Sequence, residues 1–391
     1  MRSLFQIREG IHFLNHGSFG ACPLPVFKVY RRWQKELEEQ PVEFLGRRAP
    51  LLMAESREKL AAFLGTSAGN LVYTSNASTA LNTVLKSLRL KPGDEILTSN
   101  HEYGAMDLCL DFVAEKTGAK VLRAKLDLPL QSREEVIDAF TDRMSESTRL
   151  LFLSHLSSTS ALVFPLEELT AHCRERGILT VIDGAHVPGH RPLDLEALGA
   201  DFYSGNCHKW MLSPKGAAFL YARKEVQSLV EPLVTSWGWR ADMNEDSPFV
   251  ALSHGSRFVM ENEWQGTRDI SAWLTIPAAI DFMKEHDWPM WQGKCHRRTL
   301  EARARLVEIA GLPEICPAHE DWIGQMAAFE IPPCDVIALQ KKLYETHGVE
   351  VVGIEWENRS FLRFTVQAYN TDADLEAFEK ALDCELKGDF Q

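Results

Sequence analysis

The sequence has no long hydrophobic run and no apolar leader segment. One long stretch without Asp, Glu, Lys or Arg, residues 150–166, contains several serines, a threonine and a histidine. That stretch is too polar to span a bilayer. Residues 1–10 include Arg2, Arg8 and Glu9 and lack the apolar core of a signal peptide. We therefore expect a cytoplasmic protein without a membrane partner.

The sequence also lacks paired cysteine motifs and an excess of positive charge. None of its eight cysteines forms a CxxC pair, so we expect them to be reduced. A net charge of -13 argues against nucleic acid as a partner, although one local pocket can still bind an anion. His186 and His190 have the i, i+4 spacing of metal ligands, but Pro188 and Gly189 break any helix between them. We therefore expect no metal site.

No internal repeat or Gly/Ser linker divides the chain. Its 391 residues are too many for one simple core. The middle of the chain alternates short apolar runs with helical patterns, which is typical of a mostly parallel α/β sheet. We expect strands at residues 71–75, 95–99, 121–124, 150–154, 178–182, 201–203 and 216–221.

The two ends of the chain have a different pattern. Helical periodicity occurs at residues 27–39, 299–310, 334–346 and 372–386, and strand-like alternation at 349–352 and 361–366. We therefore predict a large domain over residues 46–276 and a smaller α+β domain over residues 277–391. Residues 1–45 are expected to pack on the small domain or on the active site.

A carboxylate at a strand end and a lysine in a later loop carry the strongest chemical signal. Asp183 follows the mainly apolar run 178–182, where a buried carboxylate is costly unless a positive partner meets it. Lys209 lies further along the chain in a loop between apolar runs. Taken alone, Asp183 could be a residue that caps a helix, and Lys209 could be an ordinary surface lysine. Together they are what pyridoxal 5'-phosphate requires, because the acid keeps the pyridine nitrogen protonated and the lysine forms the Schiff base.

Several polar or aromatic residues follow other predicted strands. The turn 76–79 precedes a helix, whose free N–H groups and positive dipole end attract phosphate, although a plain N-cap explains the same residues. Tyr103 follows the strand at 95–99 and is expected to stack on a cofactor or to be a buried structural tyrosine. Ser158 is expected either to reach the cofactor's phenolic oxygen or to lie in a surface turn. His186 is expected to stack on the cofactor ring or to hydrogen-bond near its phenolic oxygen.

Three further motifs give weaker signals. Thr267 lies before a helix-like run at 270–282, where a hydroxyl suits phosphate. Arg363 lies in an alternating strand and is expected to pair with an acid or to bind a substrate carboxylate. Asn15 and His16, flanked by apolar residues, fit a segment folded over a substrate pocket or a tied-down terminus.

The segments 183–186 (DGAH) and 208–209 (HK) resemble the cofactor signature of the class V aminotransferase family of fold-type I pyridoxal phosphate enzymes. The segments 13–17 (FLNHG) and 205–210 (GNCHKW) resemble its isopenicillin N epimerase-like branch. The resemblance extends over nearly the whole chain. It implies a large domain with a mostly parallel seven-stranded sheet, a smaller α+β C-terminal domain, and a homodimer with shared active sites.

The same resemblance implies a role for each candidate residue. The catalytic candidates around the cofactor ring are Lys209 as the Schiff-base lysine, Asp183 as the pyridinium partner, His186 and Tyr103. The candidates for the cofactor's phosphate are Ala77, Ser78, Thr79, His208 and, from the second subunit, Thr267. Arg363 is the candidate for the α-carboxylate of an amino-acid substrate.

Two departures from the family pattern bear on the reaction. Cysteine desulfurases of this family carry a reactive cysteine on a loop before the carboxylate-binding arginine, and residues 349–360 contain none. Asn206 stands where many relatives have a serine that contacts phosphate. We expect an epimerase that removes a Cα proton with Lys209, with a C–S β-lyase or an aminotransferase as alternatives. A non-enzymatic regulator is disfavoured, because the chain is acidic and no basic DNA-binding module precedes the fold.

Overall fold

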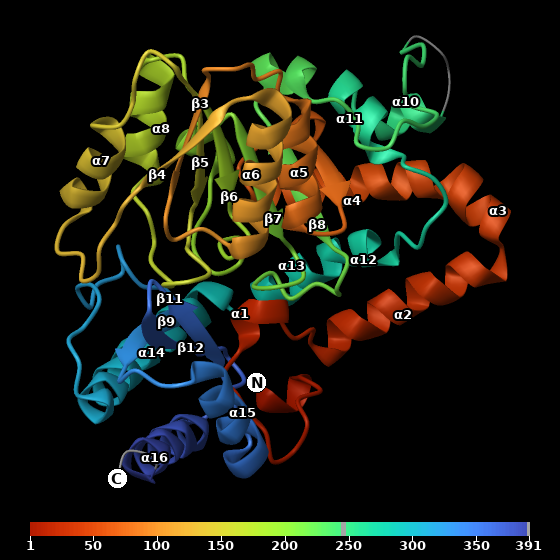
Figure 1. The fold of residues 1–391 in the computed structure, drawn as a ribbon. Coiled ribbons are helices and arrows are strands. Elements are labelled where there is room, and N and C mark those ends of the chain that lie inside the picture. The colour runs from red at the N-terminus through yellow and green to blue at the C-terminus, as the bar shows by residue number, and fades with distance from the viewer. Residues whose placement is uncertain (244–247, 389–391) are drawn as a thin grey trace.

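The computed structural model describes residues 1–243 and 248–388, and a seven-stranded sheet forms its centre (Figure 1). All neighbouring strands run parallel except that β8 is antiparallel to both of its neighbours. The expected fold-type I sheet is therefore confirmed. From edge to edge, the strands are β2 (Leu71–Thr74), β8 (Ala218–Ala222), β7 (Phe202–Asn206), β6 (Leu179–Asp183), β5 (Thr148–Ser154), β3 (Glu95–Ser99) and β4 (Lys120–Ala124).

The two faces of this sheet bury separate apolar clusters. Successive side chains of a strand point to opposite faces. On β5, Leu150 and Phe152 join one cluster, while Leu151 and Leu153 join the other. Because both faces are buried, the strands read as continuous apolar runs, which is the pattern that predicts them from sequence.

Helices cover both faces of the sheet (Figure 1). α5 and α6 contribute buried residues to the smaller apolar cluster. The helices of this part of the chain are α4 (Ala49–Phe63), α5 (Ala77–Ser87), α6 (Gly104–Thr117), α7 (Arg133–Thr141), α8 (Leu166–Glu175), α9 (Leu195–Leu198), α10 (Pro248–Leu252), α11 (Arg257–Glu263), α12 (Ser271–Leu274) and α13 (Ile276–Glu285).

The C-terminal part of the chain builds a second, three-stranded antiparallel sheet. Its order is β11 (Val352–Trp356), β12 (Arg359–Thr365) and β9 (Met326–Ile331). The helices of this part are α14 (Trp288–Ala310), α15 (Val336–His347) and α16 (Asp372–Gly388). The predicted domain boundary at residue 276 falls at the beginning of α13, and the division itself stays a prediction.

The N-terminal segment pairs with this C-terminal part. Strand β1 (His12–Phe13) runs parallel to β10 (Val349–Glu350). α1 (His16–Phe19) follows and contacts β12, and then come α2 (Leu24–Glu39) and α3 (Pro41–Glu43). In Figure 1, α1 lies between the two sheets. The first residues of the chain are therefore close to residues more than three hundred positions away.

The structure corrects two expectations about single elements and contains one strand that was not predicted. The strand expected at 349–352 is two strands in different sheets, β10 and β11, with Val351 between them. The helix expected at 270–282 is interrupted, because Pro277 has no N–H to donate to the Trp273 carbonyl, which accepts from Ser56 instead. Strand β9 was not expected, because Met326, Ala327 and Ala328 favour helix over strand and the run shows no alternation.

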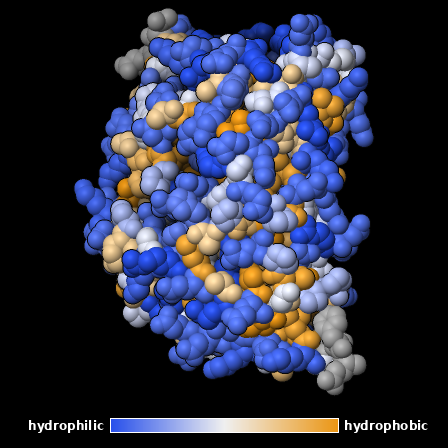
Figure 2. All heavy atoms as spheres, turned by 90° about the vertical axis from the view of Figure 1, so that its left-hand side faces the viewer, coloured by the Kyte–Doolittle hydropathy of each residue, from blue (hydrophilic) through white to orange (hydrophobic). Residues whose placement is uncertain are grey.

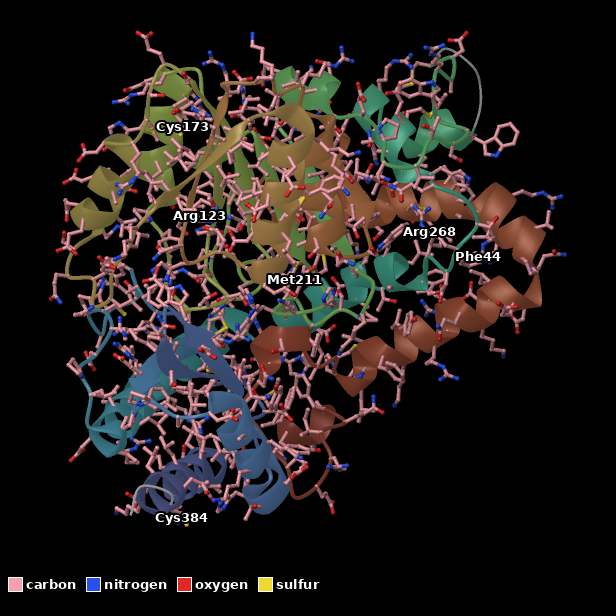
Figure 3. The ribbon with its side chains drawn as sticks, in the orientation of Figure 1. Phe44, Arg123, Cys173, Met211, Arg268 and Cys384 are labelled. Atoms are coloured by element: carbon pink, nitrogen blue, oxygen red, sulfur yellow. The ribbon has the colours of Figure 1, made fainter. Side chains whose placement is uncertain are left out.

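No described helix is both long enough and apolar enough to cross a membrane. One face of the molecule is mostly hydrophilic, with its apolar residues in small patches (Figure 2). All eight cysteines are free. Two of them, Cys173 and Cys384, lie at opposite ends of the molecule (Figure 3).

A fully buried ion pair supports the edge of the large sheet. Arg57 on α4 lies 3.1 Å from Glu263 on α11, and neither side chain is exposed. Glu263 also accepts a hydrogen bond of 3.0 Å from the backbone N–H of Tyr73, on edge strand β2. Removing one partner of such a pair leaves an uncompensated charge in the interior, which typically costs about 3–5 kcal/mol.

We therefore expect Glu263→Ala to lower the free energy of unfolding by about 3–5 kcal/mol, measured by urea denaturation. Glu261→Ala is the matched control on the same helix, because Glu261 pairs with Arg257 in a more exposed i, i+4 bridge. Its effect should stay below about 1 kcal/mol. Equal losses in the two variants would contradict a special contribution from the buried pair.

Candidate active site

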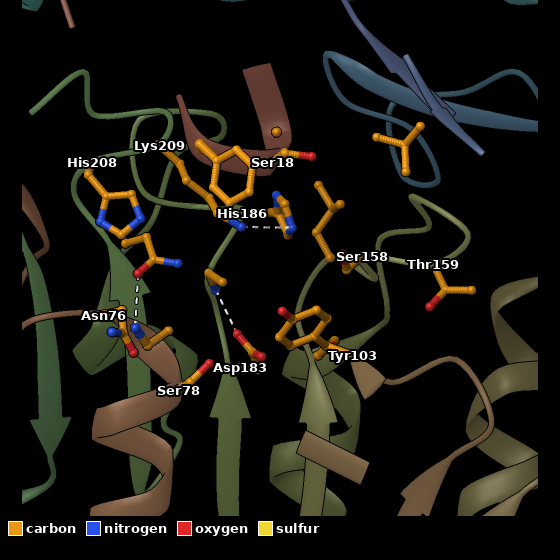
Figure 4. Close-up of a pocket in the computed structure, with 18 of the residues that line it drawn as sticks. Ser18, Asn76, Ser78, Tyr103, Ser158, Thr159, Asp183, His186, His208 and Lys209 are labelled. Carbon is orange, nitrogen blue, oxygen red and sulfur yellow. Dashed lines mark hydrogen bonds between the residues drawn. The ribbon is translucent and has the colours of Figure 1, made fainter. Parts of the chain in front are cut away.

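The carboxyl ends of five strands meet above one edge of the large sheet. In open α/β sheets this edge is where ligands bind. Polar segments follow β2, β3, β5, β6 and β7 there, and together with β11, β12 and α1 they enclose a pocket of about 650 Å³ (Figure 4). Its lining includes the predicted residues Ala77, Ser78, Tyr103, Ser158, Asp183, His186, His208, Lys209 and Arg363.

Asp183 ends β6 on the floor of this pocket. From the described part of the chain, its carboxylate accepts one hydrogen bond, of 2.9 Å, from the N–H of Ala185. Burial raises the pKa of Asp183, and the Ala185 N–H and the charge of Lys209 oppose that rise. Gly184 is required at the next position, because a Cβ there would lie 2.1 Å or less from ring atoms of Tyr203. The negative charge of this buried carboxylate is poorly compensated by its neighbours, so the site suits a cationic ligand group such as a pyridinium nitrogen.

Lys209 enters the pocket from the loop after β7. Its amine lies 3.3 Å from Nε2 of His186 (Figure 4). Burial and then the charge of Arg363 lower the pKa of Lys209 to about 7. The amine is therefore partly unprotonated near neutral pH, which is the form that attacks a carbonyl and accepts a proton. Burial also keeps His186 neutral by lowering its pKa.

The N-terminus of α5 faces the same pocket. Asn76 caps this helix by accepting a hydrogen bond of 2.8 Å from the Thr79 N–H. Asn206, at the end of β7, accepts from the Ala77 N–H at 2.9 Å. Ser78 lines the pocket, and no hydrogen bond from its N–H or hydroxyl to another described residue is seen. A helix N-terminus with such donors suits a phosphate group.

His208 lies near that helix end (Figure 4). Its Nδ1 donates to the carbonyl of Ala217 at 3.1 Å, which leaves Nε2 for a ligand. Burial lowers the pKa of His208 to about 4, so that nitrogen is unprotonated without an anion beside it. A neighbouring phosphate would raise that pKa and turn Nε2 into a donor.

Arg363 reaches the pocket from β12 of the small sheet. Its guanidinium donates to the carbonyl of Ser158, to the Ser158 hydroxyl at 2.9 Å, and to the Ser18 hydroxyl at 3.2 Å. Burial lowers its pKa to about 10, and its Nε has no hydrogen-bond partner among the described residues. A buried guanidinium that hydroxyl groups hold in place can donate two parallel hydrogen bonds to a ligand carboxylate.

Four predicted residues do not line this pocket. Thr79 points its hydroxyl to Asn76 at 3.1 Å. Thr267 is exposed. Asn15 and His16 lie outside the lining, although their neighbours 17–19 belong to it. Within a single chain, the structure thus leaves these four out of the pocket lining, although His16 contacts the backbone carbonyl of Lys209 from outside the pocket.

Other residues at the site were not predicted. Ser154, at the end of β5, and Leu156, just after it, line the pocket, and Val352 and Ile354 line it from β11. Ser154 could have been predicted from the sequence, because it is a polar residue at the end of a buried apolar strand. Polar residues at the carboxyl ends of other strands line the same pocket. For the two β11 residues the sequence carries no such signal, since their position depends on how the small sheet packs.

Glu102 is a buried carboxyl group beneath the site. It accepts hydrogen bonds from the Ser99 hydroxyl and from the N–H and hydroxyl of Ser154. It thereby joins the ends of β3 and β5. Burial, with a contribution from the charge of Asp183, raises the pKa of Glu102 to about 8.

The residues present fit pyridoxal phosphate at each of its ends. An undercompensated carboxylate faces the place for a ring nitrogen, a lysine amine lies at the place for the carbonyl, and a helix N-terminus lies at the place for phosphate. No cysteine is among the described residues that line the pocket. Burial raises the pKa of the nearby Cys207 thiol, which disfavours its reactive thiolate form.

Comparisons with known proteins agree with this site. The chain is 38% identical over 379 residues to isopenicillin N epimerase from Amycolatopsis lactamdurans, covering 94% of each chain. It is 29% identical over 431 residues to putative L-cysteine desulfhydrase 1 from Oryza sativa subsp. japonica, covering 98% of this chain and 85% of the relative.

A solved structure of the cystine C–S lyase C-DES, with glycine covalently linked to its PLP cofactor, has the same fold. Its TM-score is 0.82 at 20% identity, and the match covers 98% of this chain and 99% of that one. The family model described as aminotransferase class-V matches residues 26–378. The chain therefore belongs to the class V aminotransferase family of pyridoxal 5'-phosphate enzymes.

Proposed function

We propose that this enzyme epimerises an amino-acid or peptide-like substrate at Cα. The observation that carries the proposal is that two proton-carrying groups enter the pocket from different walls, with Asp183 between them. Lys209 follows β7, Tyr103 follows β3, and Asp183 ends β6, which lies between those strands in the sheet (Figure 4). Epimerisation needs this arrangement, because the proton is removed on one face and returned on the other.

Each residue of the site has a separate role in this proposal. Bound pyridoxal phosphate supplies an electron sink for the bond at the substrate Cα. Lys209, with its pKa lowered to about 7, takes the Cα proton as a base. Asp183 holds the positive charge on the ring nitrogen. Arg363 orients the substrate through its carboxylate, and Tyr103 returns a proton to the opposite face.

We further propose a homodimer with shared sites. Thr267 is exposed and lies outside the pocket of its own chain, and it comes shortly before α12. The family resemblance gives it a phosphate contact across the subunit boundary. Its position outside the pocket of its own chain supports that placement.

A C–S β-lyase is the second candidate. The similarity to the protein named putative L-cysteine desulfhydrase 1 supports it, because β-elimination begins with the same removal of the Cα proton. A desulfurase with a cysteine nucleophile is disfavoured, because no described residue of the pocket lining carries a thiol. An aminotransferase remains the third alternative from the sequence.

An experiment in heavy water distinguishes these three reactions. The purified enzyme is incubated in D₂O with isopenicillin N, and in a parallel reaction with L-cysteine. Deuterium at Cα together with loss of optical purity supports epimerisation. Pyruvate and sulfide from L-cysteine support the lyase, and turnover that requires an added keto acid supports an aminotransferase.

The variant Tyr103→Phe tests the two-base arrangement directly. We expect it to lower the rate of inversion by about 10²-fold or more, while Lys209 still exchanges the Cα proton of one enantiomer for deuterium. Equal losses of exchange and inversion would contradict separate roles for the two residues. The measurement is deuterium incorporation by mass spectrometry beside chiral chromatography.

A further inference from the structure

The imidazole of His16 lies behind the lysine loop and is fully buried. Its Nε2 lies 3.1 Å from the backbone carbonyl oxygen of Lys209. Its Nδ1 lies 3.0 Å from the hydroxyl of Tyr369. Since His16 does not line the pocket, its contact with the reacting lysine is through the backbone.

The partners of His16 fix its protonation. A carbonyl oxygen only accepts, so Nε2 carries the hydrogen and donates it to Lys209. Burial lowers the pKa of His16 to about 3, which leaves the imidazole neutral at physiological pH. Nδ1 must then accept the hydroxyl hydrogen of Tyr369. Both ring nitrogens are satisfied in a single tautomer.

The backbone around His16 is tied to β12. The His16 N–H donates to the Thr365 hydroxyl at 2.7 Å, and the Thr365 N–H donates to the Leu14 carbonyl at 2.8 Å. Thr365 lies two residues beyond Arg363 on the same strand. The segment that contacts the lysine is thus also fixed to the strand that carries the arginine.

The same segment packs closely against the lysine loop. Gly20 has φ +71°, and a Cβ at this position would lie 2.2 Å from the His208 carbonyl oxygen and 2.9 Å from the Lys209 Cα. No side chain fits there without moving the loop. Backbone contact at Gly20 and imidazole contact at His16 together hold residues 208 and 209 from one side.

We propose that His16 is a positioning residue for Lys209, because its imidazole holds the Lys209 carbonyl and joins the lysine loop to β12. The amine of Lys209 and the guanidinium of Arg363 then keep a fixed geometry, although they come from different sheets. The inference rests on Lys209 being the reacting amine of the proposed function. It does not depend on which reaction follows.

Two amide variants separate the contacts of His16. A glutamine side chain places its Nε2 near the position of the imidazole Nε2, so His16→Gln keeps the donor to Lys209. An asparagine side chain is shorter and reaches only the position of the imidazole Nδ1. His16→Asn therefore keeps a hydrogen-bond partner for the Tyr369 hydroxyl and loses the hydrogen bond to the Lys209 carbonyl. We expect His16→Asn to lower kcat by about tenfold to a hundredfold with a smaller change in KM. His16→Gln should recover most of that loss.

Two measurements do not use activity. Hydrogen exchange of the holoenzyme should be faster across residues 207–212 in His16→Asn than in His16→Gln. In the cofactor-free chain, trinitrobenzenesulfonate labels the unprotonated Lys209 amine, and mass spectrometry follows that labelling against pH. A looser, better hydrated loop should move the labelling midpoint of His16→Asn upward, away from the wild-type value.

Tyr369→Phe is the variant that keeps the imidazole and removes only its outer partner. It should lower kcat less than His16→Asn does, and it tests the network if His16→Asn does not fold. Equal hydrogen exchange, labelling midpoints and kcat in His16→Asn and His16→Gln would overturn the inference. Failure of the proposed function has a different signature, namely cofactor that is not trapped on Lys209 in the wild-type enzyme.

Discussion

Lys209→Ala is expected to lower turnover by about 10⁴-fold and to abolish covalent attachment of the cofactor. The loss combines the missing Schiff-base amine with the missing base for the Cα proton, and a positioned base alone contributes up to about 10⁴-fold. No other lysine lines the pocket in the described part of the chain, so no other amine is placed to substitute. Borohydride reduction followed by peptide mapping measures the attachment, and a steady-state assay measures the turnover.

Lys215→Ala is the matched control for that experiment. Lys215 lies six residues further along the same loop, is more exposed than Lys209, and donates to the Gly20 carbonyl at 2.8 Å. It does not line the pocket. The control variant should still trap the cofactor on Lys209. Trapping on a different lysine in Lys209→Ala, with turnover near the wild-type level, would contradict the assignment.

Asp183→Asn is expected to lower kcat by about 10²- to 10³-fold while the cofactor stays attached to Lys209. The amide keeps an oxygen for the Ala185 N–H, but it carries no negative charge to hold a protonated ring nitrogen. Removing one preorganised electrostatic group from an active site typically has an effect of this size. Borohydride trapping should therefore be normal in this variant, and the assay should show the loss in kcat.

Asp201→Asn is the control variant, because it removes a buried carboxylate that lies away from the active site. Asp201 lies just before β7, at the opposite edge of the sheet, where it pairs with Arg223 at 2.6 Å and accepts from the Thr180 N–H at 2.9 Å. We expect this variant to be less stable and to keep its kcat once folded. A similar fall in kcat for both variants would show that the Asp183 effect is structural.

Much of the site could be predicted because it lies at strand ends. Ser78, Tyr103, Ser158 and Asp183 each follow a short, mainly apolar run that the sequence marks as a strand, and Lys209 lies in the loop between the last two predicted strands. Parallel strands bring their carboxyl ends to one edge. The order of polar segments along the chain was therefore enough to place these residues in one pocket.

Other parts of the site depend on contacts that no local pattern encodes. Asn206 accepts from the Ala77 N–H because β7 and the first turn of α5 lie beside each other, although the two residues are 129 positions apart. Val352 and Ile354 reach the pocket only because the small sheet packs against its mouth. The place of Thr267 in a second copy stays a prediction.

The sequence by itself determined the parallel sheet, the cofactor and the lysine–aspartate pair, because apolar periodicity and polar strand ends are local properties of the chain. The tertiary structure decided what holds that pair in place. His16 and Lys209 are 193 residues apart, and His16 and Tyr369 are 353 apart. Such contacts follow from how the N-terminal segment closes between the two sheets, which spacing along the chain does not specify.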